Sequence, residues 1–220
     1  MYVDDSDLAE IFTANVRRFF ANTGTIWTAA DVFNEIAEKT SIPRSTQQTL
    51  SEIITSGLVQ ESYHLYLTSS IGIDAFTSIS SLAITLAEAK VENLLESLTP
   101  RNQKFLEIML FLLDTEMSSR SLNFWASFAE ASFDIGDGHK GDLWLQHVLP
   151  KLLEKSAWRD DLDYEEWSAY RTDVVEVFEA ICEVLEHETL SSVVTEWLDT
   201  AARKEDSEAK VVVSILSENC

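Results

Sequence analysis

The sequence of 220 residues has few turn-forming residues, with six glycines and three prolines. A many-stranded sheet needs frequent tight turns, so this scarcity favours helices joined by short loops. Cysteine is equally scarce. Cys182 and Cys220 form neither a disulfide framework nor a metal-binding pattern, and we expect a reducing compartment and a buried thiol at Cys182.

Basic residues are also few. The chain has 16 Lys and Arg against 38 Asp and Glu, which gives a formal net charge of −22. Phosphates would be repelled by this charge, so we expect no direct binding to nucleic acid. A basic protein partner is compatible with it, and the alternative is acidity that serves solubility alone.

Long apolar runs are missing as well. Residues 1–10 lack the basic start and apolar stretch of a signal peptide. The nearest approach to a membrane span is residues 80–98, where Glu88, Lys90 and Glu92 interrupt the apolar run. We therefore expect no membrane insertion.

The residues that are abundant predict a core of helices. Apolar residues make up 45% of the chain and aromatic residues 10%, enough for a sizeable core. In residues 162–190 apolar side chains recur at spacings of three and four, with acidic residues between them, which predicts a helix with one buried stripe and a very acidic back. The stripe consists of Trp167, Tyr170, Val174, Val177, Phe178, Ile181, Val184 and Leu185.

The same periodicity predicts helices along the whole chain. The expected ranges are about 6–21, 28–39, 42–57, 73–98, 101–114, 118–133, 143–158, 162–190 and 190–204, with 207–219 as the start of one more. The segment 58–70 is ambiguous, and we interpret it as a loop or a short helix.

Several residues predict where these helices begin and end. Thr28 is an expected N-cap, with Asp31 in the first turn, and Pro100 is expected at the start of its helix. Gly57 is expected to close one helix, and Pro150 to kink or break another. Either Asp161 or Asp163 is expected to cap the acidic helix.

These elements predict an all-α fold. Pairs of such helices match the length of a HEAT or armadillo repeat, roughly 40–47 residues, so we expect an α-solenoid of antiparallel helix pairs. Residues 1–220 would then form one helical-repeat segment, part of a longer solenoid. The alternative is a closed helical bundle.

No motif indicates an active site, a metal or a cofactor, and we expect a protein that is not an enzyme. Residues 134–142 contain three acids and three glycines, but the order of acids differs from that of an EF-hand, so a surface loop is favoured over a calcium site. The four histidines lack zinc spacing. Serine occurs without the GxSxG pattern of hydrolases.

Two clusters are candidates for binding. The aromatic residues Phe124, Trp125 and Phe128 are interpreted as packing between helices rather than as a binding hot spot. Five acids within seven residues repel one another unless they are solvated or paired with basic residues of a partner. The candidate contacts for a basic partner are Asp160, Asp161, Asp163, Glu165 and Glu166, and the alternative is a solvated loop.

Three passages together resemble the importin-β superfamily of nuclear transport receptors, specifically its importin-13 and transportin-3 type. They are FTSISSLAITLAEAKVENLLESL (76–98), SLNFWASFAEASFD (121–134) and DYEEWSAYRTDVVEVFEAICEVL (163–185), with VLPKLLEKSAW before the last. Their joint order carries the resemblance, over roughly residues 31–198. The chain would correspond to a minority of a full-length member.

The resemblance implies a karyopherin segment, built of HEAT repeats, that carries basic protein cargo between nucleus and cytoplasm. It also implies Ran-GTP and nuclear pore proteins as partners. The alternative function is a non-catalytic helical-repeat scaffold within a larger complex, unrelated to Ran.

Overall fold

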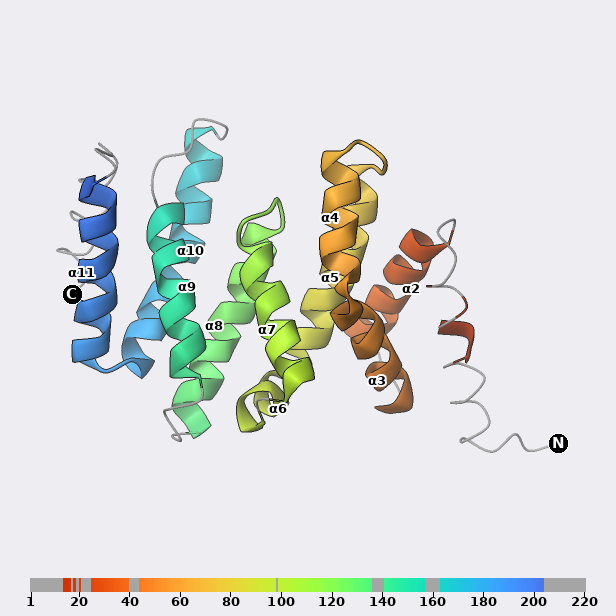
Figure 1. Cartoon of the computed structure of the whole chain (residues 1–220), viewed down its shortest axis with the longest axis horizontal. Coiled ribbons are helices and arrows are strands. Elements are labelled where there is room, and N and C mark those ends of the chain that lie inside the picture. Colours follow the sequence, from red (N-terminus) through yellow and green to blue (C-terminus); the bar gives the residue numbers. More distant parts are fainter. Residues whose placement is uncertain are drawn as a thin grey trace. The chain divides into compact units, whose positions relative to one another are not determined.

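The computed structural model describes residues 14–16, 18, 20, 25–39, 44–97, 99–135, 141–156 and 163–203 (Figure 1). Every element in these ranges is helical and none is a strand, so the prediction of an all-α fold is confirmed for this part of the chain. The chain divides into two compact units, Met1–Arg120 and Ser121–Cys220.

Unit 1 is assembled around one central helix, α5. Helices α2, α4 and α7 all pack against it, and α5 buries ten of its residues, Phe76 and the run from Ile79 to Ala87. A hydrogen bond from Thr85 Oγ1 to Asn34 Oδ1, 2.7 Å long, joins α5 to α2. The elements of this unit are α2 (Ile26–Lys39), α3 (Arg44–Ile53), the π-helical turn η1 (Ile54–Leu58), α4 (Val59–Leu67), α5 (Ile73–Glu88), α6 (Val91–Glu96) and α7 (Pro100–Leu112).

Gly57 separates two helices that follow each other almost without a loop. Its φ of 108° lies in the left-handed region that favours glycine, so the chain bends there and α4 starts two residues later. The expected end of a helix at Gly57 is therefore confirmed. The ambiguous segment after it is a helix, α4, and not a loop.

Two expectations for helix ends in unit 1 are wrong. The predicted single helix over 73–98 breaks at Ala89 and Lys90, where the backbone of Lys90 leaves helical geometry and its side chain reaches α3. Thr28 is no N-cap, because α2 starts at Ile26 and Asp31 falls beyond its first turn. Ile26 and Ala30 are both buried, so packing extends the helix past the polar residue.

Other predicted ends are confirmed. Pro100 occupies the first turn of α7, and Thr99 caps that helix by accepting a hydrogen bond from the backbone N–H of Asn102. Of the first predicted helix, residues 14–16, 18 and 20 are helical, and Val16 and Phe20 are buried. The rest of that helix and the segment 207–219 lie outside the described residues.

Unit 2 contains most of α8 (Ser118–Ile135), then α9 (Asp142–Lys155), α10 (Tyr164–Val184) and α11 (His187–Arg203). Both α10 and α11 pack against α9. A kink or a break was expected at Pro150, and no break occurs, because Pro150 lies inside α9 without ending it. Phe124, Trp125 and Phe128 of α8 are completely buried, with ring centroids 5.1–5.8 Å apart. This confirms that they pack in the core.

Candidate functional site

The predicted acidic cluster divides into a structural residue and solvent-facing residues. Asp163 caps α10, since its Oδ1 accepts a hydrogen bond of 2.8 Å from the backbone N–H of Glu166. The side chains of Glu165 and Glu166 are exposed. Asp160 and Asp161 lie outside the described residues. Asp163 therefore stabilises the start of the helix, and Glu165 and Glu166 are available to a partner.

Helix α10 has the two faces that its sequence predicts, although Phe178 and Val184 of the predicted stripe are only half-buried. Trp167, Tyr170, Val174, Val177 and Ile181 are buried, and Leu185 after the helix is buried too. The opposite face carries Glu176, Glu179 and Glu183, all exposed, at spacings of three and four. Side chains at such spacings are neighbours on a helix surface. These three residues, which we call the α10 acidic face, were not among the predicted contacts, although the sequence pattern placed acids on this side.

The α10 acidic face is electrostatically unfavourable for the helix itself. Within the described part of the chain none of its three carboxylates forms an ion pair, and the last turn of α10 contains no basic residue. Like charges three and four residues apart destabilise a helix, by about 0.2–0.5 kcal/mol a pair. Carboxylates near the C-terminus also oppose the helix dipole. This face is therefore poorly suited to stabilising α10.

The basic residue of α10, Arg171, contacts an aromatic ring of the same helix. Arg171 lies over the ring of Trp167, with its Cζ 5.2 Å from the ring centroid. Tyr164, one turn before Trp167, is 69% exposed, and its ring centroid lies 6.3 Å from that of Trp167. The helix thus begins with an exposed aromatic ring beside Glu165 and Glu166.

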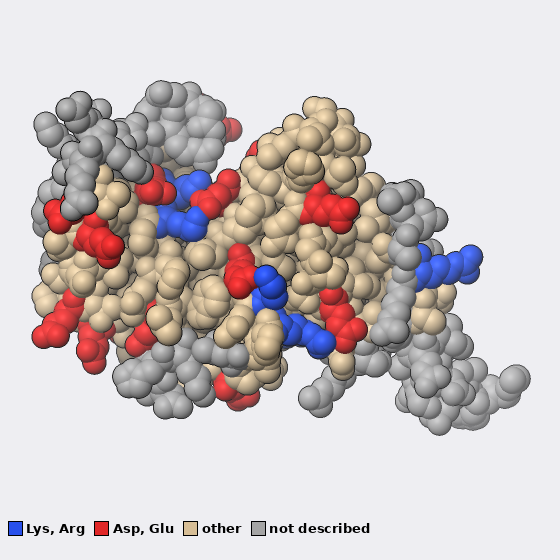
Figure 2. Space-filling view, in the orientation of Figure 1, with Lys and Arg blue, Asp and Glu red and all other residues tan. Residues whose placement is uncertain are grey.

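Helix α11 carries a second acidic surface. A shallow hollow of about 630 Å³ runs along one of its faces. Figure 2 shows acidic side chains over this helix. The hollow is lined by hydroxyl and carboxylate side chains and one imidazole: His187, Glu188, Ser191, Ser192, Thr195, Glu196, Asp199 and Thr200.

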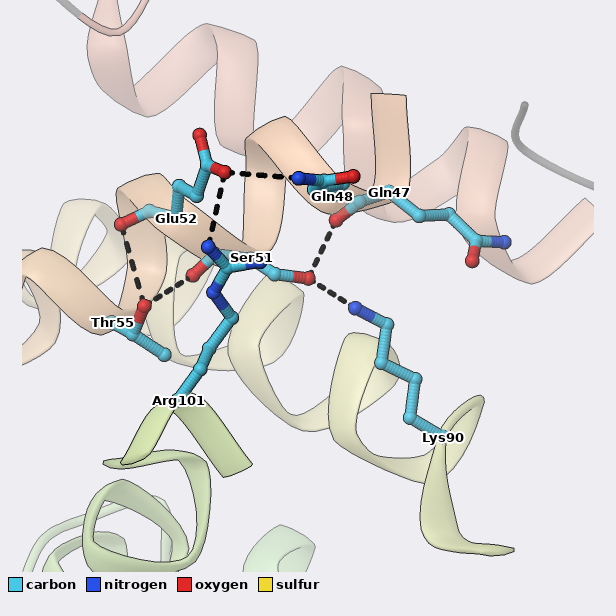
Figure 3. Close-up of polar contacts among 7 residues, drawn as sticks. All are labelled: Gln47, Gln48, Ser51, Glu52, Thr55, Lys90 and Arg101. Carbon is cyan, nitrogen blue, oxygen red and sulfur yellow. Dashed lines mark hydrogen bonds and ion pairs between the residues drawn. The ribbon is translucent and has the colours of Figure 1, made fainter. Parts of the chain in front are cut away.

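A polar cluster in unit 1 joins α3, α7 and the break between α5 and α6 (Figure 3). The Nζ of Lys90 contacts the Oγ of Ser51 and lies 5.5 Å from the ring centroid of Phe105. Glu52 pairs with Arg101 at 3.1 Å and accepts a hydrogen bond from Gln48. Burial, and secondarily the charge of Arg101, lowers the pKa of Lys90.

A lysine of lowered pKa beside a serine is the chemistry of an activated nucleophile. The surroundings do not fit that role, because Ser51 is 0% exposed and its hydroxyl donates to the carbonyl oxygen of Gln47. A substrate would have no access to it. The contact instead ties α3 to the break between α5 and α6. The contact could not be predicted from the sequence, because Ser51 and Lys90 are 39 residues apart.

An aromatic cluster joins α4, α5 and the end of α7. Tyr63 packs against Phe76 and Phe111, with centroids 5.1 and 5.3 Å apart, and Tyr66 stacks on Phe76. A hydrogen bond to Glu116 raises the pKa of Tyr66, and burial followed by the charges of Glu116 and Asp114 raises the pKa of Tyr63. The cluster stabilises packing in unit 1.

The other candidate sites gain no support from the geometry. Within the described ranges no group of three or more potential ligands could hold a metal ion, and no helix could cross a membrane. His64 and His187 are exposed, and His147 lies against the carbonyl oxygen of Leu143. Residues 136–140 of the loop weighed for calcium lie outside the described residues. Cys182 is half-buried rather than fully buried.

Comparisons of the chain with family models, with curated proteins and with solved structures found no match.

Proposed function

We propose that this chain is a non-catalytic helical segment that binds basic segments of partner proteins through unit 2. The α10 acidic face carries the proposal. Glu176, Glu179 and Glu183 are aligned, exposed and without an ion pair among the described residues, and their arrangement opposes helix stability. Lysine or arginine side chains of a partner would relieve this repulsion and would be steered to it by long-range attraction.

We propose further that the helices form HEAT-like repeats of a solenoid and that the segment serves in a nuclear transport receptor. In unit 2 the packing is compatible with repeats, because α9 contacts both α10 and α11, which follow it in the chain. In unit 1 neighbouring helices such as α4 and α5 also pack together, although the most extensive contact joins α2 to α5. The transport role rests on the sequence resemblance. A basic cargo segment is the partner that both the resemblance and the acidic surface favour.

The binding proposal is tested by reversing the charge of the α10 acidic face. A variant with Glu176→Lys, Glu179→Lys and Glu183→Lys is compared with wild type for binding a fluorescent Lys- and Arg-rich peptide at low and moderate salt. We expect a loss of about ten-fold in affinity at low salt, and a smaller loss as salt screens the charges.

The matched control reverses three exposed carboxylates on three other helices, Glu92, Glu130 and Glu154. It changes the net charge by the same amount and should reduce affinity by about two-fold or less. Equal losses in the two triple variants would show that net charge alone attracts the peptide, and the binding proposal would then fail.

The transport role is tested separately from peptide binding. Captured nuclear proteins should be basic and should be released when Ran-GTP is added, whereas Ran-GDP should have little effect. Capture that is insensitive to both nucleotide forms would favour the alternative, a scaffold unrelated to Ran.

A further inference from the structure

Unit 1 contains an apolar cavity that has no part in the acidic surfaces of unit 2. It has a volume of about 680 Å³ and lies between α2 and the bent segment formed by α3, η1 and α4. Its walls include Ile26 and Trp27 on one side and Ile53, Leu58 and Leu65 on the other. This size lies within the range of about 300–1,000 Å³ that is usual for ligand sites.

The bend at Gly57 shapes this cavity. Ile54 and Val59, which flank the bend, are 0% exposed, whereas their neighbours Ile53 and Leu58 line the cavity and remain half-buried. A Cβ atom at Gly57 would meet no atom within 4 Å, so the glycine is required by its backbone angle and not by close packing.

The wall formed by the end of η1 and by α4 is elongated. Leu58 of η1 and Glu61 and Leu65 of α4 follow one another at spacings of three and four, so they lie along one side of the helical segment over about 10 Å. An elongated groove of this kind suits a peptide segment better than a compact small molecule.

Glu61 is the charged residue among the described lining. Its side chain is exposed and forms no ion pair with any residue that the structure describes. Since the chain as a whole carries a net charge of −22, an acidic occupant would be repelled and a basic one attracted.

We propose that this groove binds a short segment of a partner protein in which bulky apolar side chains alternate with lysine or arginine. The apolar side chains would contact Trp27, Leu58 and Leu65, and the cation would pair with Glu61. This site is independent of the proposed function of unit 2, because no residue of the α10 acidic face belongs to it.

The test uses the full chain and three short labelled peptides. The first carries Phe and Leu between lysines, the second has glutamates in place of the lysines, and the third has serines in place of Phe and Leu. We expect the first to bind at least about five-fold more tightly than either of the others. A compact apolar amine, phenethylamine, should bind much more weakly than the first peptide, and equal binding would overturn the choice of a peptide occupant.

Nuclear magnetic resonance locates the bound peptide. The chain has six tryptophans, of which Trp27 is the first and Trp125 the second. The indole N–H resonance of Trp27 is assigned as the one that disappears in a Trp27→Phe variant. The first peptide should shift this resonance. A shift confined to the indole of another tryptophan, such as Trp167, would overturn the site.

A change of specificity gives the sharpest result. Glu61→Lys should reduce the preference for the lysine peptide over the glutamate peptide by about two- to five-fold, because a cation replaces the carboxylate that would pair with lysine. Tighter binding of the glutamate peptide than in wild type cannot arise from misfolding. Glu92→Lys, which reverses an exposed carboxylate outside the cavity, should keep the original preference. An unchanged preference in Glu61→Lys would overturn the proposal, and the α10 triple variant should leave this site intact.

Discussion

Helices α5 and α10 differ in how many of their residues are buried and in where their charged residues lie. Among the 16 residues of α5 ten are buried, and its charged side chains, Asp74 and Glu88, lie near its two ends. Among the 21 residues of α10 five are buried, and the exposed side is acidic along most of its length. Burial accounts for almost the whole sequence of α5. It accounts for one face of α10 and leaves the acids of the other face without a stabilising role.

The largest effect should come from opening a cavity beside α5. Leu82 is 0% exposed, so Leu82→Ala should lower the free energy of unfolding by about 3 kcal/mol through lost burial and an unfilled space. Leu67→Ala makes the same change at a side chain that is 61% exposed and should cost about 0.5 kcal/mol or less. Urea denaturation measures both, and similar losses would contradict the assignment of α5 as the core of unit 1.

The next effect separates the cap of α10 from its acidic surface. Asp163→Ala should destabilise the protein by about 1 kcal/mol, because it leaves the N–H of Glu166 without its acceptor. Asp163→Asn keeps a hydrogen-bond acceptor and should therefore retain most of the stability that Asp163→Ala loses. Thermal unfolding compares both with Glu165→Ala, an exposed neighbour that should change stability little. If Asn destabilised as much as Ala, the charge of Asp163 would matter more than its capping bond.

A smaller effect concerns the half-buried cation of unit 1. Lys90→Met removes a partly desolvated charge, keeps an apolar stem near Phe105, and leaves Ser51 bonded to Gln47. We expect the free energy of unfolding to rise by between zero and about 1 kcal/mol, since water still screens part of this charge.

The same variant has a predicted pH dependence. The pKa of Lys90 is lower in the folded state than its ordinary value of 10.5, so the unfolded state binds more protons in the window between the two values. Wild type should therefore gain stability as pH rises through that window, and the advantage of Lys90→Met should shrink. Denaturation of both proteins at neutral pH and in that alkaline window measures the difference, and an advantage that grew with pH would contradict the direction of the shift.

The smallest effect should be a gain in stability. Glu179→Lys replaces like-charge neighbours with opposite-charge pairs to Glu176 and Glu183 and places a cation toward the C-terminus of α10. We expect a gain of about 0.5 kcal/mol in unfolding free energy together with weaker binding of a basic peptide. Calorimetry and peptide titration on one preparation measure the two changes. A loss of stability would show that this carboxylate has a structural role.

The sequence predicted elements whose signals are local. Pro100 after Thr99 marks the start of α7, and the stripe beginning at Trp167 defines the buried face of α10. The misses depend on contacts between distant segments. At the break the side chain of Lys90 contacts Ser51, and at the early start of α2 the side chain of Ile26 is buried. The groove in unit 1 was missed for the same reason, because Trp27 and Leu65 line one cavity only after folding.

The central position of α5 has a consequence for synthesis on the ribosome. Helix α2 ends at Lys39, whereas α5, the helix against which it packs most extensively, ends at Glu88. At a translation rate of about 5–20 residues per second, the apolar side of α2 would wait roughly 2–10 s for its partner to be made. During this interval the nascent chain is exposed to aggregation, and it is then that chaperones would have most to protect.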